Sequence, residues 1–263
     1  MDDSLRNALW NWIYSVFEAG SVKRQATGVA DYWRYAARYG MWDEFFHYQV
    51  DDIPSDTKKA VKAYFTMAEW WEAYNFVECV LQNLSRLRPY DDRISGAESE
   101  RRLNTLLERE VSGYRAIEER LVPVTSTVEI EEIRRASSPT AGFEGIATHI
   151  NAALALLSRK PEPDYRNSIK ESISAVEAAA KLLTGEKSGG IDKALGILEG
   201  KHPLHKAFKD ALSKLYGYTS DQDGIRHPIL AEEVITAAEA RFMLVACSAF
   251  ANFLLDLGKD ATA

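Results

Sequence analysis

Apolar residues recur at helical spacing along almost the whole chain, and this periodicity most limits what the chain can fold into. An α-helix repeats about every 3.6 residues, so this spacing predicts helices that each bury one apolar stripe. The sequence therefore predicts an all-α fold. The expected helices are 4–19, 24–39, 41–48, 55–86, 97–112, 129–158 with a break at 137–142, 165–184, 190–199, 203–217 and 229–258.

One short stretch departs from the helical pattern. Residues 113–125 carry alternating and β-branched positions that indicate two short extended segments, so we expect one small β-hairpin near 113–125. Ser126 and Glu129 then form a Ser-x-x-Glu capping box, which predicts that the helical pattern restarts there.

Large aromatic residues are concentrated at the start of the chain, where all six tryptophans lie within the first 71 residues. Such density predicts a core packed with rings. A groove in which nucleic-acid bases stack is the alternative. The core is favoured because basic residues do not alternate with most of the rings. The stretch "RASSPTAG" marks the best boundary, which predicts an aromatic-rich helical domain over 1–137 and a helical bundle over 138–263.

Charge and cysteine content limit which partners and which cellular compartment fit the chain. Its formal net charge of −7 excludes a broad basic face for nucleic acid, so any such contact must be a small concentrated patch. Cys79 and Cys247 both fall in apolar helical patterns, which favours core thiols in a reducing compartment. We see neither a secretory signal nor an apolar stretch of membrane-spanning length. We therefore expect a soluble, cytoplasmic protein without membrane contact.

An arginine–histidine pair, Arg226 and His227, precedes the last predicted helix, which we expect to begin at Pro228. The N-terminal end of a helix attracts anions, and a guanidinium forms a planar fork suited to phosphate. A histidine at this positive end stays neutral and can accept a proton. These features are typical of a phosphodiester site. The alternative is that Glu232 and Glu233 neutralise Arg226 and that His227 only caps the helix.

The predicted helix 165–184 has Asp164 as a plausible N-cap and Gly185 as a plausible C-terminal glycine. Polar residues flank its apolar stripe, and they either border a groove or are simply solvated. The last helix is apolar nearly all round, which is typical of a central helix or of one paired with a second chain. We expect a homodimer through the C-terminal helices. The expected buried positions of helix 165–184 are Tyr165, Ile169, Ser172, Ile173, Val176, Ala180 and Leu183.

Three stretches carry a resemblance to a known family: "LEREVSGYRAIEERLVPVTS", "PDYRNSIKESISAVEAAAK" and "KLYGYTSDQDGIRHP". Together they resemble bacterial proteins classed with the AbiJ-type N-terminal domain of abortive-infection systems, whose C-terminal part is similar to the HEPN superfamily. The resemblance implies an up-and-down helical bundle after about residue 140 that dimerises through its helices. It also implies a role in antiphage or toxin-like defence.

Active members of the HEPN superfamily are metal-independent endoribonucleases, which implies RNA as a substrate. Their motif is an Arg, a polar residue, a few further residues and then a His. In that chemistry the Arg stabilises phosphate charge, and the His transfers protons during attack by the RNA 2′-hydroxyl. The resemblance would place Arg226 and Arg166 on phosphate and His227 as acid or base. Asn167 and Glu171 would orient or polarise the reacting groups.

The sequence departs from the motif at its closing His. Residues 231–233 are Ala-Glu-Glu, and residues 171–173 are Glu-Ser-Ile, so neither arginine is followed by a His at the expected distance. One interpretation is a rearranged site built from His227 together with Arg166, Asn167 and Glu171. The other is a retained fold without nuclease activity, namely a dimeric helical sensor or interaction module that binds a protein partner.

The other histidines and the remaining short motifs do not indicate a functional site. His202 and His205 have a spacing that can place two metal ligands on one helical face, but no cysteine or carboxylate cluster accompanies them. His47 and His149 are isolated within helical patterns and are interpreted as surface or core residues. Neither a phosphate-binding loop nor a Gly-x-Ser-x-Gly elbow occurs. We expect no cofactor and no metal.

Overall fold

The computed structural model describes residues 1–25, 37–86, 96–138, 143–185, 191–201, 205–220 and 235–260. The chain divides into two compact units, Met1–Pro123 and Val124–Ala263. The division thus falls between residues 123 and 124. The predicted domain boundary between residues 137 and 138 would fall at the end of helix α6 (Thr127–Ser137), and it stays a prediction. In the structure α6 packs against α7 and α11 of the second unit.

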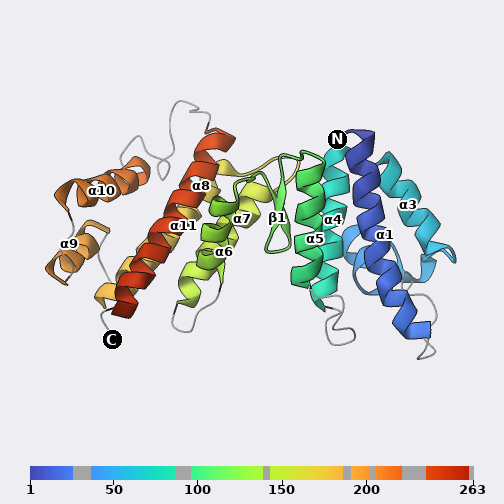
Figure 1. The fold of residues 1–263 in the computed structure, drawn as a ribbon, viewed down its shortest axis with the longest axis horizontal. Coiled ribbons are helices and arrows are strands. Elements are labelled where there is room, and N and C mark those ends of the chain that lie inside the picture. The colour runs from blue at the N-terminus through green and yellow to red at the C-terminus, as the bar shows by residue number, and fades with distance from the viewer. Residues whose placement is uncertain are drawn as a thin grey trace. The chain divides into compact units, whose positions relative to one another are not determined.

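Four helices of the first unit, α1, α3, α4 and α5, lie side by side, and a hairpin packs on α4 and α5 (Figure 1). Figure 1 labels the elements and colours them by residue number. The elements of this unit are α1 (Asp3–Gln25), the π-helix η1 (Ala37–Phe45), the 3-10 helix η2 (Val50–Asp52), α3 (Thr57–Met67), α4 (Trp70–Arg86), α5 (Gly96–Arg109), β1 (Arg115–Ile117) and β2 (Arg120–Val122).

Aromatic rings fill the core of the first unit. Trp12, Phe65 and Phe76 are buried, and the last two are among the largest side chains with almost no exposed surface. Around Phe76 the rings meet mostly edge to face, the geometry that aromatic quadrupoles prefer, with centroids 4.9–6.0 Å apart. The predicted ring-packed core is confirmed. The clustered rings are those of Phe45, Phe46, Tyr64 and Phe76.

The predicted β-hairpin is confirmed. β1 pairs antiparallel with β2, with Ala116 opposite Leu121, and the two-residue turn Glu118–Glu119 has positive φ at both positions. Positive φ at both central residues is the signature of the type I′ turn, which matches the twist of the two strands. Asn104 of α5 extends the sheet hydrogen bonding, because its side chain accepts from the N–H of Ala116 and donates to its C=O.

In its described residues the second unit is built of helices joined by loops and contains no strand. α8 packs against α7, α9 and α11, while α11 also packs against α6 and α7, and α10 packs against α9 (Figure 1). The all-α fold with one small hairpin is therefore confirmed. The helices of this unit are α6 (Thr127–Ser137), α7 (Glu144–Ser158), α8 (Tyr165–Thr184), α9 (Ile191–Lys201), α10 (Lys206–Ser220) and α11 (Ala237–Asp260).

Small side chains let the helices of the second unit approach closely. Ser168, Ser172 and Ala175 of α8 have no exposed surface. The Ser168 hydroxyl donates to the C=O of Ala153 on α7 at 2.9 Å, and the Ser172 hydroxyl donates to the C=O of Ser168 at 2.8 Å. Buried hydroxyls need such partners because an unpaired one costs about 1–3 kcal/mol.

Several predicted helix boundaries are wrong. α1 runs unbroken from Asp3 to Gln25, through residues 20–23, where a break between two helices was expected. The helix expected over 55–86 is two helices, because the N–H of Glu69 bonds to the Glu72 carboxylate and starts α4 anew. The last described helix begins at Ala237 and not at Pro228, because Thr236 and Glu239 form a reciprocal capping box. In that box the Thr236 N–H donates to the Glu239 carboxylate, and the Glu239 N–H donates to the Thr236 hydroxyl.

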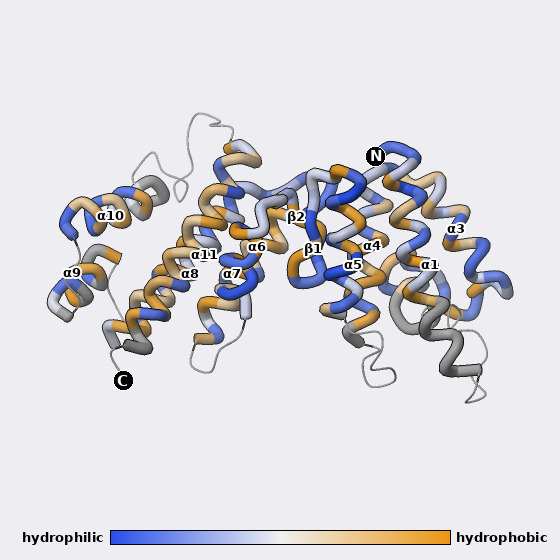
Figure 2. Tube along the Cα trace, viewed as in Figure 1, coloured by the Kyte–Doolittle hydropathy of each residue, from blue (hydrophilic) through white to orange (hydrophobic). Residues whose placement is uncertain are grey.

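α11 also corrects the expectation that no apolar stretch reaches membrane-spanning length. Among the described residues it is the one helix that is long and apolar enough to span a membrane, over 237–257. Figure 2 shows hydrophobic residues along much of it. Half of this window is buried inside the protein, where α11 packs against α6, α7 and α8.

Candidate functional site

The polar residues at the start of α8 are placed by the cap of that helix. One oxygen of the Asp164 carboxylate accepts from the backbone N–H of Asn167 at 3.1 Å, and the other accepts from the Asn167 side chain at 2.8 Å. At the far end Gly185 has a φ of 69°, which glycine adopts without strain. Both predicted ends of this helix are confirmed.

Three of the five predicted site residues lie on the accessible half of α8. Arg166 and Glu171 are partly exposed and Asn167 is exposed, whereas Ser168 and Ser172 on the opposite half are buried. A helix turns by about 100° per residue, so Arg166 and Glu171 point about 140° apart, toward the two flanks of the accessible half. The fold keeps all three residues accessible, with Asn167 between the other two.

The other two predicted site residues, Arg226 and His227, lie outside the described residues. The prediction that they stand at the first turn of the last helix does not apply to α11, because that helix begins at Ala237. Whether the pair meets α8 therefore stays a prediction.

The structure adds a histidine to the predicted set. His149 of α7 lies beside Glu171 of α8, and its Nδ1 is 2.8 Å from the Glu171 carboxylate. The side chains are 37% and 28% exposed, so the pair lies at the edge of the helix packing and is open to solvent. Sequence reasoning interpreted His149 as an isolated surface or core residue. The structure instead joins it to a predicted site residue.

The geometry of the α7–α8 pair explains this contact. The loop 159–164 reverses the chain, so α7 and α8 run antiparallel. The hydrogen bond from Ser168 to Ala153 fixes how far each helix is shifted along the other. About one turn further along both helices, His149 comes opposite Glu171. Because the residues are far apart in sequence, only the expectation of an antiparallel helical hairpin at this loop could have revealed the pair.

The remaining described histidine of the second unit has a structural role. Nδ1 of His205 accepts a hydrogen bond from the N–H of Ala207 at 3.2 Å and so caps the start of α10. His202 lies outside the described residues. Within the described ranges, no group of three or more His, Cys, Asp or Glu side chains is arranged to hold a metal ion.

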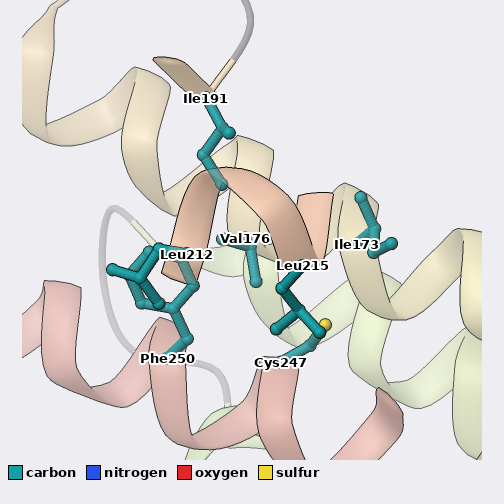
Figure 3. Close-up of a pocket in the computed structure, with 7 residues that line it drawn as sticks. All are labelled: Ile173, Val176, Ile191, Leu212, Leu215, Cys247 and Phe250. Atoms are coloured by element: carbon teal, nitrogen blue, oxygen red, sulfur yellow. The ribbon is translucent and has the colours of Figure 1, made fainter. Parts of the chain in front are cut away.

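A small apolar hollow of about 10 Å³ lies where α8, α9, α10 and α11 meet (Figure 3). The buried Cys247 lies at one side of it, and burial raises the pKa of its thiol to about 12. A hollow without polar side chains offers no group for acid, base or phosphate chemistry. It belongs to the packing of the α9–α10 pair. Its lining residues are Ile173, Val176, Ile191, Leu212, Leu215, Cys247 and Phe250.

Comparison with known proteins gives one match. Residues 1–138 match the family AbiJ N-terminal domain 4, and this stretch is more than half of the 263 residues. No curated protein and no solved structure shows significant similarity to the chain. The match covers the first unit and α6, and none of the candidate site residues lies within it.

Proposed function

The chain belongs to the AbiJ N-terminal domain 4 family, and from this premise we propose that it is an abortive-infection defence protein that cleaves RNA. The family places it among abortive-infection proteins. The C-terminal unit is then a HEPN-like bundle that acts on RNA phosphodiesters without a metal ion. We place this activity in the cytoplasm, where its RNA substrates occur.

The observation that carries the ribonuclease proposal is the accessible half of α8. It presents a guanidinium, a side-chain amide and a carboxylate within two turns, at Arg166, Asn167 and Glu171. A guanidinium can hold a phosphate through two N–H groups, and polar neighbours can orient the attacking hydroxyl. In the proposed reaction Arg166 and Arg226 bind the phosphate and His227 transfers protons. Asn167 and Glu171 orient the reacting groups.

Incubation of the purified full chain with bacterial RNA in the presence of EDTA tests this function. We expect fragments that end in cyclic phosphate, because attack by the 2′-hydroxyl leaves such an end. Arg166→Ala should reduce the cleavage rate at least about 100-fold, since removal of one group that stabilises transition-state charge costs about that much. Arg135→Ala removes an arginine that pairs with Asp256 at a surface site, and it serves as the control. Equal rates in all three proteins would remove Arg166 from the reaction.

A non-catalytic interaction module is the second candidate, and exposed rings on the C-terminal helices favour it. Phe242 of α11 is 61% exposed and Phe208 of α10 is 44% exposed, while Phe208 packs edge-on against Phe253 at 5.6 Å. Apolar rings on a surface are typical of a protein contact. We propose that this surface joins two copies of the chain, and the dimer is compatible with either function.

Light scattering of the purified chain tests the dimer. We expect the wild type to have twice the mass of one chain and Phe242→Ser to be a monomer. Leu182→Ser also removes an exposed apolar side chain, which lies on α8 and is 46% exposed, so it should leave the mass unchanged. A wild-type monomer would exclude the dimer. A dimeric Phe242→Ser would place the interface elsewhere.

A further inference from the structure

A histidine and a carboxylate are hydrogen-bonded across two helices at an accessible edge of the second unit. The His149 Nδ1 lies 2.8 Å from the Glu171 carboxylate, and more than a third of the His149 side chain is exposed. A carboxylate can only accept, so Nδ1 donates to it, and in the neutral imidazole Nε2 then holds a lone pair. Within the described ranges no side chain or backbone group is hydrogen-bonded to that Nε2.

We propose that His149 is a catalytic residue of the RNA-cleaving site, that it takes the role of proton acceptor assigned above to His227, and that Glu171 is its positioning residue. This inference rests on the proposed ribonuclease function. A carboxylate bonded to Nδ1 fixes the tautomer and orientation of an imidazole and stabilises the imidazolium that forms when Nε2 takes a proton. The pair supplies a proton acceptor beside residues 171–173 of α8. The sequence there is Glu-Ser-Ile and lacks the closing His of the motif.

Small residues keep the α7 side of the pair open. Along α7, the positions one turn before and after His149 are the small residues Gly145 and Ala152, and a Cβ at Gly145 would meet no atom within 4 Å. On α8 the exposed Asn167 lies one turn before Glu171, and the exposed Lys170 precedes Glu171 in sequence and points about 100° away around the helix. The Lys170 ammonium adds positive charge to this stretch of α8, which favours the approach of a phosphate anion.

The proposed step is a transesterification. The RNA 2′-hydroxyl gives its proton to Nε2 of His149, and the 2′-oxygen forms a bond to the adjacent phosphorus. The bond from phosphorus to the 5′-oxygen breaks, and that oxygen leaves with the bonding electrons and takes a proton from water. The hydroxide that remains takes the proton back from the His149 imidazolium. The products are a cyclic phosphate end and a 5′-hydroxyl end.

Replacement of His149 in the purified full chain tests its role as proton acceptor. We expect His149→Ala to lower kcat about 100-fold or more with little change in KM, since general acid–base catalysis contributes about 10²–10⁴-fold. Added imidazole should restore part of the rate to this variant and leave the wild type unchanged. His149→Asn keeps a donor toward Glu171 and so protects the helix pair, but it should be equally slow. The control His205→Ala removes the capping histidine of α10 and should keep the wild-type rate.

Glu171 is tested through its conservative variants. Glu171→Gln loses the charge that stabilises the imidazolium, so it should lower kcat about tenfold or more and leave KM little changed. Glu171→Asp keeps the charge and should recover part of the rate. A purely structural role of the pair would leave kcat the same in Glu171→Gln and Glu171→Asp, provided that both fold.

The wild-type reaction separates the two ways in which this idea can fail. If the wild type cleaves RNA and folded His149→Asn cleaves it at the same rate, His149 is not catalytic, while the proposed function stands. If the wild type cleaves no RNA, either purified or in phage-infected cells, the ribonuclease function and the role of His149 both fail. If His149→Ala cleaves RNA slowly and added imidazole restores part of its rate, both the ribonuclease function and the catalytic role of His149 are supported.

Discussion

The cores of the two units are packed with different kinds of side chain. The first packs large rings such as Phe65 and Phe76, and it uses polar side chains such as Asn104 to complete its backbone hydrogen bonds. The second packs helices through small residues such as Ser172 and Ala175, which keep the helix axes close. Close axes push longer polar side chains to the edges of the packing, where His149 and Glu171 meet.

The family match and the candidate site also lie in different parts of the chain. The family match covers the first unit and α6, whereas the hydrogen-bonded pair of His149 and Glu171 lies on α7 and α8. Membership therefore says little about the second unit on its own. The contrast between the cores can be tested directly, because the two units carry different probes. All six tryptophans lie in the first unit, and Cys247 lies in the second.

The largest expected effect is the loss of a ring from the first core. Phe76 is fully buried and contacts several other rings, so Phe76→Ala should lower the free energy of unfolding of the first unit by about 3–5 kcal/mol. Urea unfolding followed by tryptophan fluorescence measures it. Trp70→Ala removes a ring that is 37% exposed and should cost clearly less. A cost below about 1 kcal/mol for Phe76→Ala would mean that the ring cluster does not hold this unit together.

The core of the second unit should be sensitive to added side-chain volume, whereas that of the first unit is sensitive to its loss. Ala175 of α8 has no exposed surface, so Ala175→Leu adds volume where the helices are already close and should cost about 1–3 kcal/mol. The urea dependence of Cys247 alkylation, read by mass spectrometry of its peptide, reports this unit. Lys181→Leu places the same side chain at an exposed position of the same helix and should be nearly neutral. If Ala175→Leu were neutral as well, close packing would not describe this core.

Local signals predicted most of the fold. Helical periodicity, the caps at Asp164 and Gly185 and the alternation within 113–125 each depend on residues close in sequence, and all are confirmed. The errors arose where two local signals competed. A continuous apolar pattern over 55–86 hid the restart at Glu69, and Pro228 was preferred over the Thr-x-x-Glu box that starts at Thr236.

The candidate site could be predicted only in part, because its contacts join residues far apart in sequence. The polar face of α8 follows from its spacing, so the accessibility of Arg166, Asn167 and Glu171 could be predicted, while their role in a site stays a prediction. The contact between His149 and Glu171 depends on how α7 and α8 are shifted along each other, which no local pattern encodes. A histidine on a helix has no special signal until its neighbour across the packing is known.

The smallest of the three effects concerns the thiol in the second core. Burial raises the pKa of Cys247 from 9.0 to about 12, so the folded state keeps the thiol protonated while the unfolded state ionises it above pH 9.0. A raised pKa in the folded state means that its stabilising contribution is complete below pH 9.0 and declines as the pH rises toward 12. Between about pH 8 and pH 10 this unit should lose about 1.4 kcal/mol because of this one group.

Other groups also titrate in this interval, so the informative quantity is the difference between the wild type and Cys247→Ala. Replacement of the thiol lowers stability by a constant amount at every pH, because a methyl group does not titrate. The stability of the wild type should therefore fall more steeply with pH than that of the variant, by about 1.4 kcal/mol over the interval. Unfolding is followed by far-ultraviolet circular dichroism in both proteins, since the variant has no thiol to label. Parallel pH profiles would show that Cys247 is accessible to water in the folded state, and the packing between α8 and α11 would then be looser than that of the aromatic core.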